Sequence, residues 1–204
     1  MRFTGSMTRQ EANRGFTLIE LLVTLAVIAT LSLGVAPFVR DIVEKQRLVG
    51  AVEAVHSQFV LAKSEALKRS EEVHVRVVSE NSNVDWWVGI GEEDRNKDGT
   101  DDGNCDPKET TPSAGDACTL SYLETDGSTL TRILRVTDNT GFAGVELDSS
   151  EAIYNFDPVR GTVGGGNVEL ESDNYLVRIV ISGLGRLRIC SPTGGKNLGR
   201  YTDC

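Results

Sequence analysis

A long apolar segment near the N-terminus limits what this chain can fold into more than any other feature. The segment spans residues 16–39 and contains a single charged residue, Glu20. Roughly 20 apolar residues are enough for a helix to cross the hydrocarbon core of a bilayer. The residues before it include arginines at positions 2, 9 and 14, and basic residues stay on the cytoplasmic side. We therefore expect residues 16–39 to form an anchoring helix, with the C-terminus across the membrane.

The start of the apolar segment does not match an ordinary secretory signal, whose cleavage site follows the apolar stretch. The stretch RGFTLIELLVTLAVIATL instead joins a glycine, a glutamate and an apolar run at short spacing. It resembles the class III leader of type IV pilins and type II secretion pseudopilins. The resemblance implies that a prepilin peptidase removes residues 1–15, cutting after Gly15, and methylates Phe16. Met7 is an alternative start that would shorten the leader to residues 7–15.

Glu20 needs a physical reason, because a carboxylate inside an apolar helix costs about 3 kcal/mol on insertion scales. Such residues are usually functional. The resemblance implies that Glu20 pairs with the N-terminal amine at Phe16 of a neighbouring subunit and fixes axial register in a filament. The alternative is a tolerated charge near the membrane edge.

Beyond the apolar segment, the sequence has the pattern of an amphipathic helix. Apolar side chains recur at steps of three and four, which marks one helical face, at Leu48, Val52, Val55, Phe59, Ala62 and Ala66. We expect one helix over residues 17–69, of which residues 40–69 pack on a sheet. At 1.5 Å per residue this helix is about 75–80 Å long, which suits a filament subunit better than an isolated globular domain.

Residues 70–204 are expected to form a β-rich head of short strands separated by turn-forming residues. The expected strands are 73–77, 84–90, 120–123, 130–136, 152–156, 161–163, 175–182 and 186–190. One long helix followed by many strands predicts an α+β fold with antiparallel sheet packed on the helix. The stretch LAKSEALKRSEEVHVRVV (residues 61–78) resembles the FimT, FimU and GspH group of minor pilins and pseudopilins, which implies the type IV pilin fold. We expect His56 and His74 to be structural or surface residues.

The chain has four cysteines: Cys105, Cys118, Cys190 and Cys204. Their even number, wide spacing and lack of a CxxC pattern favour disulfides over a zinc site. Three connectivities are possible, and we favour Cys105–Cys118 with Cys190–Cys204, which closes the two shortest loops. Disulfides indicate an oxidising compartment. The alternative is a cytosolic protein with four reduced cysteines.

An acidic stretch over residues 91–106 suggests a calcium loop. Its candidate ligands share oxygen chemistry and EF-hand-like spacing around Gly99; they are Asp94, Asn96, Asp98 and Asp102. The final loop position, however, holds Cys105 instead of a bidentate glutamate. A solvated turn closed by a Cys105–Cys118 bond is the favoured alternative.

The C-terminal part of the chain is basic, although the whole chain has a net charge of -9. The sequence Gly185-Arg186-Leu187-Arg188 resembles the GRxR signature of FimT-type minor pilins that bind DNA during natural transformation. On a strand, Arg186 and Arg188 would share one face and reach phosphates, with Lys196 and Arg200 on the following loop. The alternative is that the arginines form salt bridges, with Glu169 or Glu171.

These features predict a minor type IV pilin in the tip or priming complex of a pilus, needed for assembly and for motility, adhesion or DNA uptake. The alternatives are a DNA-binding minor pilin for natural transformation and a GspH-like minor pseudopilin of type II secretion. The expected partners are other major and minor pilins, prepilin peptidase, the inner membrane before assembly and DNA. The expected location is the inner membrane of a Gram-negative bacterium, with a periplasmic C-terminus, and then the extracellular pilus. We expect no enzymatic activity, because no catalytic arrangement stands out, and no cofactor other than the candidate Ca²⁺.

Overall fold

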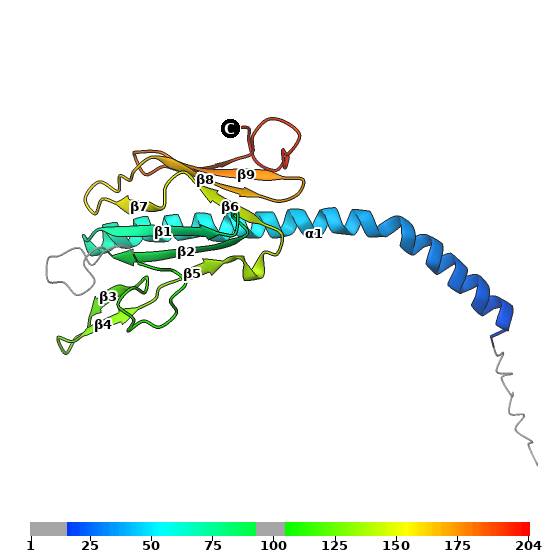
Figure 1. Ribbon diagram of the computed structural model, residues 1–204, viewed down its shortest axis with the longest axis horizontal. Coiled ribbons are helices and arrows are strands. Elements are labelled where there is room, and N and C mark those ends of the chain that lie inside the picture. The colour runs from blue at the N-terminus through cyan, green and yellow to red at the C-terminus, as the bar shows by residue number, and fades with distance from the viewer. Residues whose placement is uncertain (1–15, 93–104) are drawn as a thin grey trace, which may run out of the picture. The chain divides into compact units, whose positions relative to one another are not determined.

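The computed structural model describes residues 16–92 and 105–204, apart from the side chains of residues 33–37. The chain forms two compact units, one ending at Asp41 and the other spanning Ile42–Cys204. A single helix, α1 (Leu18–Arg69), contributes to both, and the strands all belong to the second unit (Figure 1). The helix begins and ends within one residue of its predicted bounds.

In the second unit, α1 presents one face to the β-strands. All six apolar residues predicted for this face are fully buried, and Ala51 joins them. Phe59 lies at the centre of the face, where its ring packs edge-on against that of Tyr154 at a centroid distance of 5.1 Å. Burying a large apolar side chain contributes about 1.5–3 kcal/mol, so this face holds the helix against the sheets.

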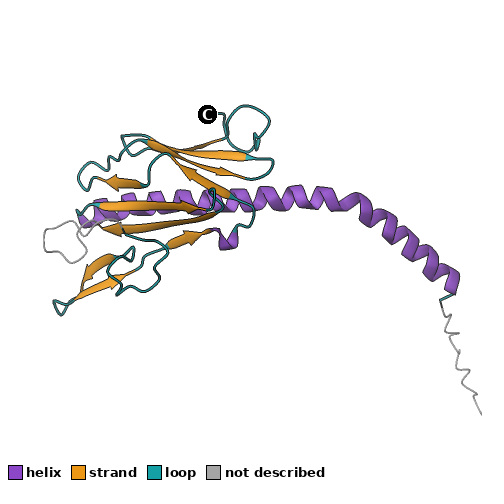
Figure 2. Ribbon diagram, in the orientation of Figure 1, coloured by secondary structure: helices purple, strands orange, loops and turns teal. Residues whose placement is uncertain are grey.

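The strands form antiparallel sheets beside the helix (Figure 2). The first sheet has the order β5-β2-β1-β7 and comprises β1 (Val73–Glu80), β2 (Asp85–Glu92), β5 (Val136–Asp138) and β7 (Ile153–Phe156). The second has the order β10-β9-β8-β6 and comprises β6 (Glu146–Ser149), β8 (Gly166–Glu171), β9 (Leu176–Ile181) and β10 (Leu187–Cys190). A separate hairpin pairs β3 (Leu120–Leu123) with β4 (Thr129–Arg132), and a short 3-10 helix, η1 (Asn139–Gly141), follows β5. One helix packed on antiparallel sheet confirms the predicted α+β class.

Alternation of buried and exposed side chains explains why each sheet has an inner face. Along β9, Val177, Ile179 and Ile181 are buried, whereas the residues between them are half-exposed. Successive side chains of a strand point to opposite faces, so every second residue enters the core.

Two strand predictions were wrong, and one observed strand was missed. The expected strand 130–136 is two strands, because β4 pairs with β3 whereas β5 leaves the hairpin and pairs with β2. The expected strand 161–163 reduces to one bridge between Val163 and Phe156, and the true strand begins at Gly166. β6 was not predicted, because its sequence Glu-Leu-Asp-Ser is rich in residues that strands disfavour.

Two glycines in β2 make room for a disulfide against the first sheet. A Cβ at Gly89 would lie 2.9 Å from Cys118 Sγ, and one at Gly91 would lie 2.9 Å from Cys105 Sγ. The Cys105–Cys118 bond therefore rests directly on the bare backbone of β2. Glycine normally weakens a strand interior unless another group approaches closely, as the disulfide does here.

Candidate functional site

The N-terminus of α1 carries a local cap that includes Glu20. The backbone N–H of Glu20 donates to the carbonyl oxygen of Thr17 at 3.1 Å and lies 3.3 Å from Thr17 Oγ1. Thr-x-x-Glu is the capping-box spacing, and a carboxylate in the first turn complements the helix dipole. From the sequence, Glu20 is interpreted as a contact between subunits or, alternatively, as a tolerated charge near the membrane edge. The Thr17-to-Glu20 spacing was the signal for this second, local role.

The first part of α1 exposes an unusual amount of apolar surface. Nine large apolar side chains of α1 before residue 32 are each more than half exposed: Leu18, Ile19, Leu21, Leu22, Val23, Leu25, Val27, Ile28 and Leu31. Monomeric soluble proteins rarely expose large contiguous apolar patches. Among the residues that the structure describes, no helix reaches the length and mean hydropathy of a membrane span. The bilayer-spanning role of residues 16–39 therefore stays a prediction.

The processing site lies at the border of the described chain. Gly15 falls outside the described residues, and Phe16, the first one described, is 81% exposed. Cleavage after Gly15 and methylation of Phe16 stay predictions.

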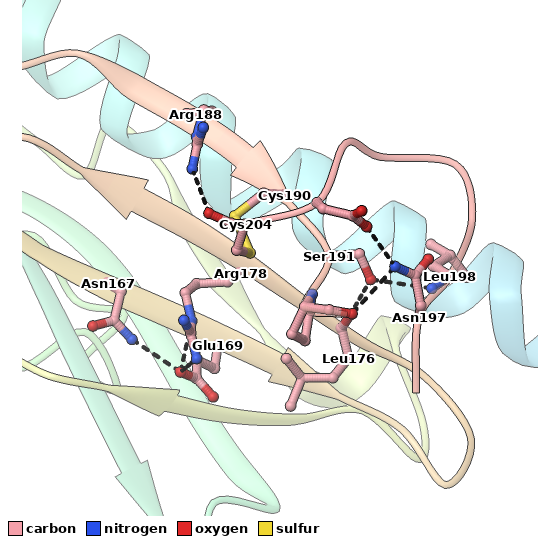
Figure 3. Close-up of a disulfide and its surroundings, with 12 residues drawn as sticks. Asn167, Glu169, Leu176, Arg178, Arg188, Cys190, Ser191, Asn197, Leu198 and Cys204 are labelled. Atoms are coloured by element: carbon pink, nitrogen blue, oxygen red, sulfur yellow. Dashed lines mark hydrogen bonds and ion pairs between the residues drawn. A yellow bond between two sulfur atoms is a disulfide. The ribbon is translucent and has the colours of Figure 1, made fainter. Parts of the chain in front are cut away.

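The two arginines of the GRxR sequence lie at the start of the last strand of the second sheet, which begins one residue later than predicted. Arg188 is in β10 and Arg186 directly precedes it, and both are exposed. They border a shallow hollow of about 240 Å³ whose other lining residues are Val180 and Ser182. Arg188 Nη2 donates to the carbonyl oxygen of Cys204 at 3.2 Å (Figure 3). Within the described parts of the chain, the guanidinium of Arg186 has no hydrogen-bond or ion-pair partner.

Gly185 fixes the position of these arginines. Its φ of +69° is in the left-handed region, and a Cβ at this position would overlap the carbonyl oxygen of Gly161. The Gly185 carbonyl in turn accepts a hydrogen bond from Lys63 Nζ of α1 at 2.8 Å. The turn before β10 is thus tied to the helix, and only glycine fits it.

Lys196 and Arg200 differ from the two arginines because each is bonded to a carboxylate. Lys196 forms an ion pair with Glu171, and the hydrogen bond between the two side chains raises the pKa of Lys196. Arg200 Nη2 lies 3.2 Å from Glu53 Oε1 on α1. The positive charges of Lys196 and Arg200 are therefore partly neutralised by glutamates of the same chain.

The alternative prediction paired Arg186 or Arg188 with Glu169 or Glu171. The structure instead gives Glu169 to Arg178, at 2.6 Å, and Asn167 Nδ2 donates to the same carboxylate (Figure 3). Glu171 is bonded to a lysine, as described above. The carboxylates nearest in the sheet are thus occupied by other cations.

The disulfides are Cys105–Cys118 and Cys190–Cys204, the pairing favoured from the sequence. The second bond attaches the C-terminal loop to the end of β10 (Figure 3). Ser191 secures the same loop, because its Oγ donates to the carbonyl oxygen of Leu176 at 2.8 Å. That Oγ also accepts from the backbone N–H of Leu198 at 3.1 Å.

The candidate calcium ligands lie outside the described residues. In the described ranges, 16–92 and 105–204, no group of three or more His, Cys, Asp or Glu side chains is placed to hold a metal ion. His74 is buried, with Nε2 3.3 Å from Cys105 Sγ, and burial lowers the pKa of the half-buried His56. The structure gives both histidines surroundings that a structural role explains.

A buried ion pair at the end of α1 was missed from the sequence. Arg69 Nη2 lies 2.9 Å from Glu92 Oε2, and the two side chains are 10% and 3% exposed. The Arg69 guanidinium also lies over the ring of Tyr122, 5.0 Å from its centroid. These residues are far apart in sequence and share no motif, so no pattern indicated the contact. It ties the helix end to β2 and β3.

Comparison with known proteins gives two family matches. The prokaryotic N-terminal methylation motif matches residues 12–36, and the family described as type II transport protein GspH matches residues 51–185. No curated protein matches the chain.

Two solved structures are similar to the chain at low identity. The type IV minor pilin FimU of Pseudomonas aeruginosa is 15% identical, with a TM-score of 0.46, over 75% of this chain and 98% of that chain. The minor pseudopilin EpsH from the type 2 secretion system of Vibrio cholerae is 13% identical, with a TM-score of 0.41, over 72% of this chain and 97% of that chain. The GspH match covers more than half of the residues of this chain, and the methylation motif precedes that match. The chain therefore belongs to the GspH family and is a structural, non-enzymatic subunit of the minor pilin and pseudopilin type.

Proposed function

We propose that this protein is a minor type IV pilin that is cleaved after Gly15 and incorporated into a pilus, in its tip or priming complex. The observation that carries the proposal is the continuous helix α1, which is capped at Thr17 and exposes apolar side chains throughout residues 18–31. Packing against the equivalent helices of neighbouring subunits would bury this surface, at about 25 cal/mol for each Å² removed from water. A filament core and a bilayer both provide such surroundings, at different stages of assembly.

Glu20 has the position that a register-setting residue requires. It lies in the first turn of α1, four residues from Phe16. Within an apolar filament core its carboxylate would need a cationic partner, because an unpaired buried charge costs several kcal/mol. The amine created at Phe16 of a neighbouring subunit supplies that charge.

The test is to follow processing and assembly of the full chain in its own host. Mass spectrometry of the N-terminal peptide should show a methylated Phe16, and the protein should appear in sheared pili. Glu20→Gln should be processed but reduced at least tenfold in pili. Thr30→Ala is the matched control, because the Thr30 hydroxyl bonds only the helix backbone at Val27. Equal amounts of Glu20→Gln and wild-type protein in pili would contradict the proposal.

Deleting the gene in the same host distinguishes a pilus subunit from a subunit of a type II secretion pseudopilus. A pilin predicts that deletion reduces surface pili and leaves secreted enzymes unchanged. The alternative, a GspH-like minor pseudopilin, is favoured by the description of the matched family. It predicts that deletion blocks secretion and leaves the pili intact.

A second candidate function is DNA binding during natural transformation, favoured by the exposure of Arg186 and Arg188 on one face. The guanidinium of Arg186 has no partner among the described residues, and that of Arg188 bonds one backbone oxygen, so both could contact successive phosphates. The full chain in detergent should bind duplex DNA in a salt-sensitive manner. The double change Arg186→Gln with Arg188→Gln should weaken binding at least tenfold, whereas Lys196→Gln should have a smaller effect because Lys196 is already paired. Binding that is independent of salt or of these arginines would contradict this function.

A further inference from the structure

Two loop tips of the second unit present apolar side chains to solvent. Val159, in the loop between β7 and β8, is 82% exposed, and Leu184, in the turn between β9 and β10, is 81% exposed. Among the described residues of this unit, Leu123 is the other large apolar side chain with similar exposure, at 78%, and it lies on the β3–β4 hairpin. A single exposed apolar side chain needs no explanation, but Val159 and Leu184 lie on adjoining loops.

The two loops are fixed to each other and to the helix. The backbone N–H of Val163 donates to the carbonyl oxygen of Gly183 at 3.3 Å. Gly185 packs against Gly161 so closely that a Cβ would overlap the Gly161 carbonyl oxygen, and Lys63 of α1 is bonded to Gly185. The apolar tips therefore belong to one surface, beside the last turns of α1.

The first loop is also stiffened from within. The Asp157 carboxylate accepts hydrogen bonds from the backbone N–H groups of Val159, at 2.9 Å, and Arg160, at 2.7 Å. These bonds lower the pKa of Asp157, so the carboxylate stays ionised and holds the turn. A preformed loop loses little entropy when it binds a partner.

Two arginines flank the apolar tips. Arg160 follows Val159, Arg186 follows Gly185, and both are exposed. In the described chain neither guanidinium has a hydrogen-bond or ion-pair partner. On a chain of net charge -9, this is a local reversal of sign that favours an anionic partner.

The apolar side chains favour a protein over a nucleic acid as that partner. A phosphate backbone would satisfy the arginines but would give Val159 and Leu184 nothing to pack against. Protein interfaces have an apolar centre in which arginine is enriched and the other charged residues are depleted. The head of this chain groups acidic side chains, since Glu146, Glu171 and Asp173 all act electrostatically on Lys196. A neighbouring subunit with a similar acidic group would complement the two arginines.

We propose that Val159, Arg160, Leu184 and Arg186, which we call the loop-tip patch, dock on an acidic, partly apolar surface of a neighbouring subunit of the pilin type. This inference rests on the proposed function, because it takes the protein to be part of a filament. It assigns the patch a role in choosing the adjacent subunit, separate from the role of α1 in the filament core.

The test places a photo-crosslinking amino acid at Leu184 of the full chain in the host cell. Leu123 is the matched control, because it is 78% exposed but lies on the β3–β4 hairpin. Irradiated filaments should yield a crosslink from position 184 to a pilin-type subunit, identified by mass spectrometry, and little product from position 123. The double change Arg160→Glu with Arg186→Glu should reduce the yield about tenfold, which corresponds to about 1.4 kcal/mol. Lys108→Glu should not, because Lys108 is paired with Glu80 elsewhere on the head.

The outcomes separate this inference from the proposed function. If the protein is in filaments but position 184 yields no crosslink, or one to DNA or lipid, the docking inference is overturned and the proposed function stands. If the protein is absent from filaments altogether, the proposed function fails, and the inference fails with it.

Discussion

The substitution Gly185→Ala should strongly destabilise the head. Gly185 has a φ of +69°, which costs alanine roughly 1–2 kcal/mol. The added Cβ would also overlap the carbonyl oxygen of Gly161, so the turn must move away from that loop. Movement would break the bond from Lys63 to the Gly185 carbonyl, and a hydrogen bond to a charged group is worth about 1.5–3 kcal/mol. Because Lys63 is only partly buried, we take the lower end and expect a total of about 3 kcal/mol.

Gly199 provides a control that separates strain from overlap. Its φ is +71°, almost the same as that of Gly185, but a Cβ there would meet nothing within 4 Å. Gly199→Ala should therefore cost only the conformational part, roughly 1–2 kcal/mol. Chemical denaturation of the oxidised full chain in detergent, followed by circular dichroism, would measure both. Equal losses in the two variants would refute the reasoning, because the contact with Gly161 would then have no energetic consequence.

Three further perturbations test other parts of the structure. Replacing Cys190 and Cys204 together by serine should lower stability by about 3 kcal/mol, the value for a loop of about 15 residues, and an unchanged melting temperature would show that Ser191 alone holds the C-terminal loop. Burial lowers the pKa of His56 from its ordinary 6.5, so the unfolded chain binds the proton more readily and stability should fall as pH drops below about 6.5. His56→Gln should reduce that slope in denaturation measured from pH 7.5 to 5, and an identical slope would exclude His56 as its source. Ser82 has a φ of +57° in the β1–β2 turn, so Ser82→Gly should be neutral or stabilising by up to about 1 kcal/mol in thermal unfolding, whereas a clear loss would show that the serine side chain has an undetected role.

The helix could be predicted almost completely because local signals define it at every point. Residues of the Leu48-to-Ala66 face repeat at helical spacing, and Thr17 and Arg69 mark the two ends. Strands with clear alternation, such as the first one at Val73, were predicted for the same reason. β8 alternates equally well at Val168 and Leu170, but three glycines lie at its start, and glycine clusters are typical of turns.

Long-range pairing could not be predicted from single segments. The pairing of β5 with β2, instead of with the hairpin that precedes it, depends on contacts between residues far apart in sequence. The same holds for charge partners. The sequence identified Arg186 and Arg188 as candidates, but only the structure showed that Arg178 and Lys196 occupy the carboxylates proposed for them. For this reason, Arg186 and Arg188 remain candidates for DNA binding.

The disulfide that rests on Gly89 and Gly91 has a consequence for sequence variation among relatives. Replacing either glycine requires the sulfur atoms to move, and losing the sulfur atoms would leave bare backbone uncovered beneath them. The two glycines and the two cysteines should therefore change together in evolution. Pro107 Cβ and His74 Nε2 would each lie 2.8 Å from a Cβ at Gly89 and Gly91, respectively. A relative that has lost Cys105 and Cys118 is therefore expected to carry larger side chains at the two glycine positions only where the positions of Pro107 and His74 have changed as well.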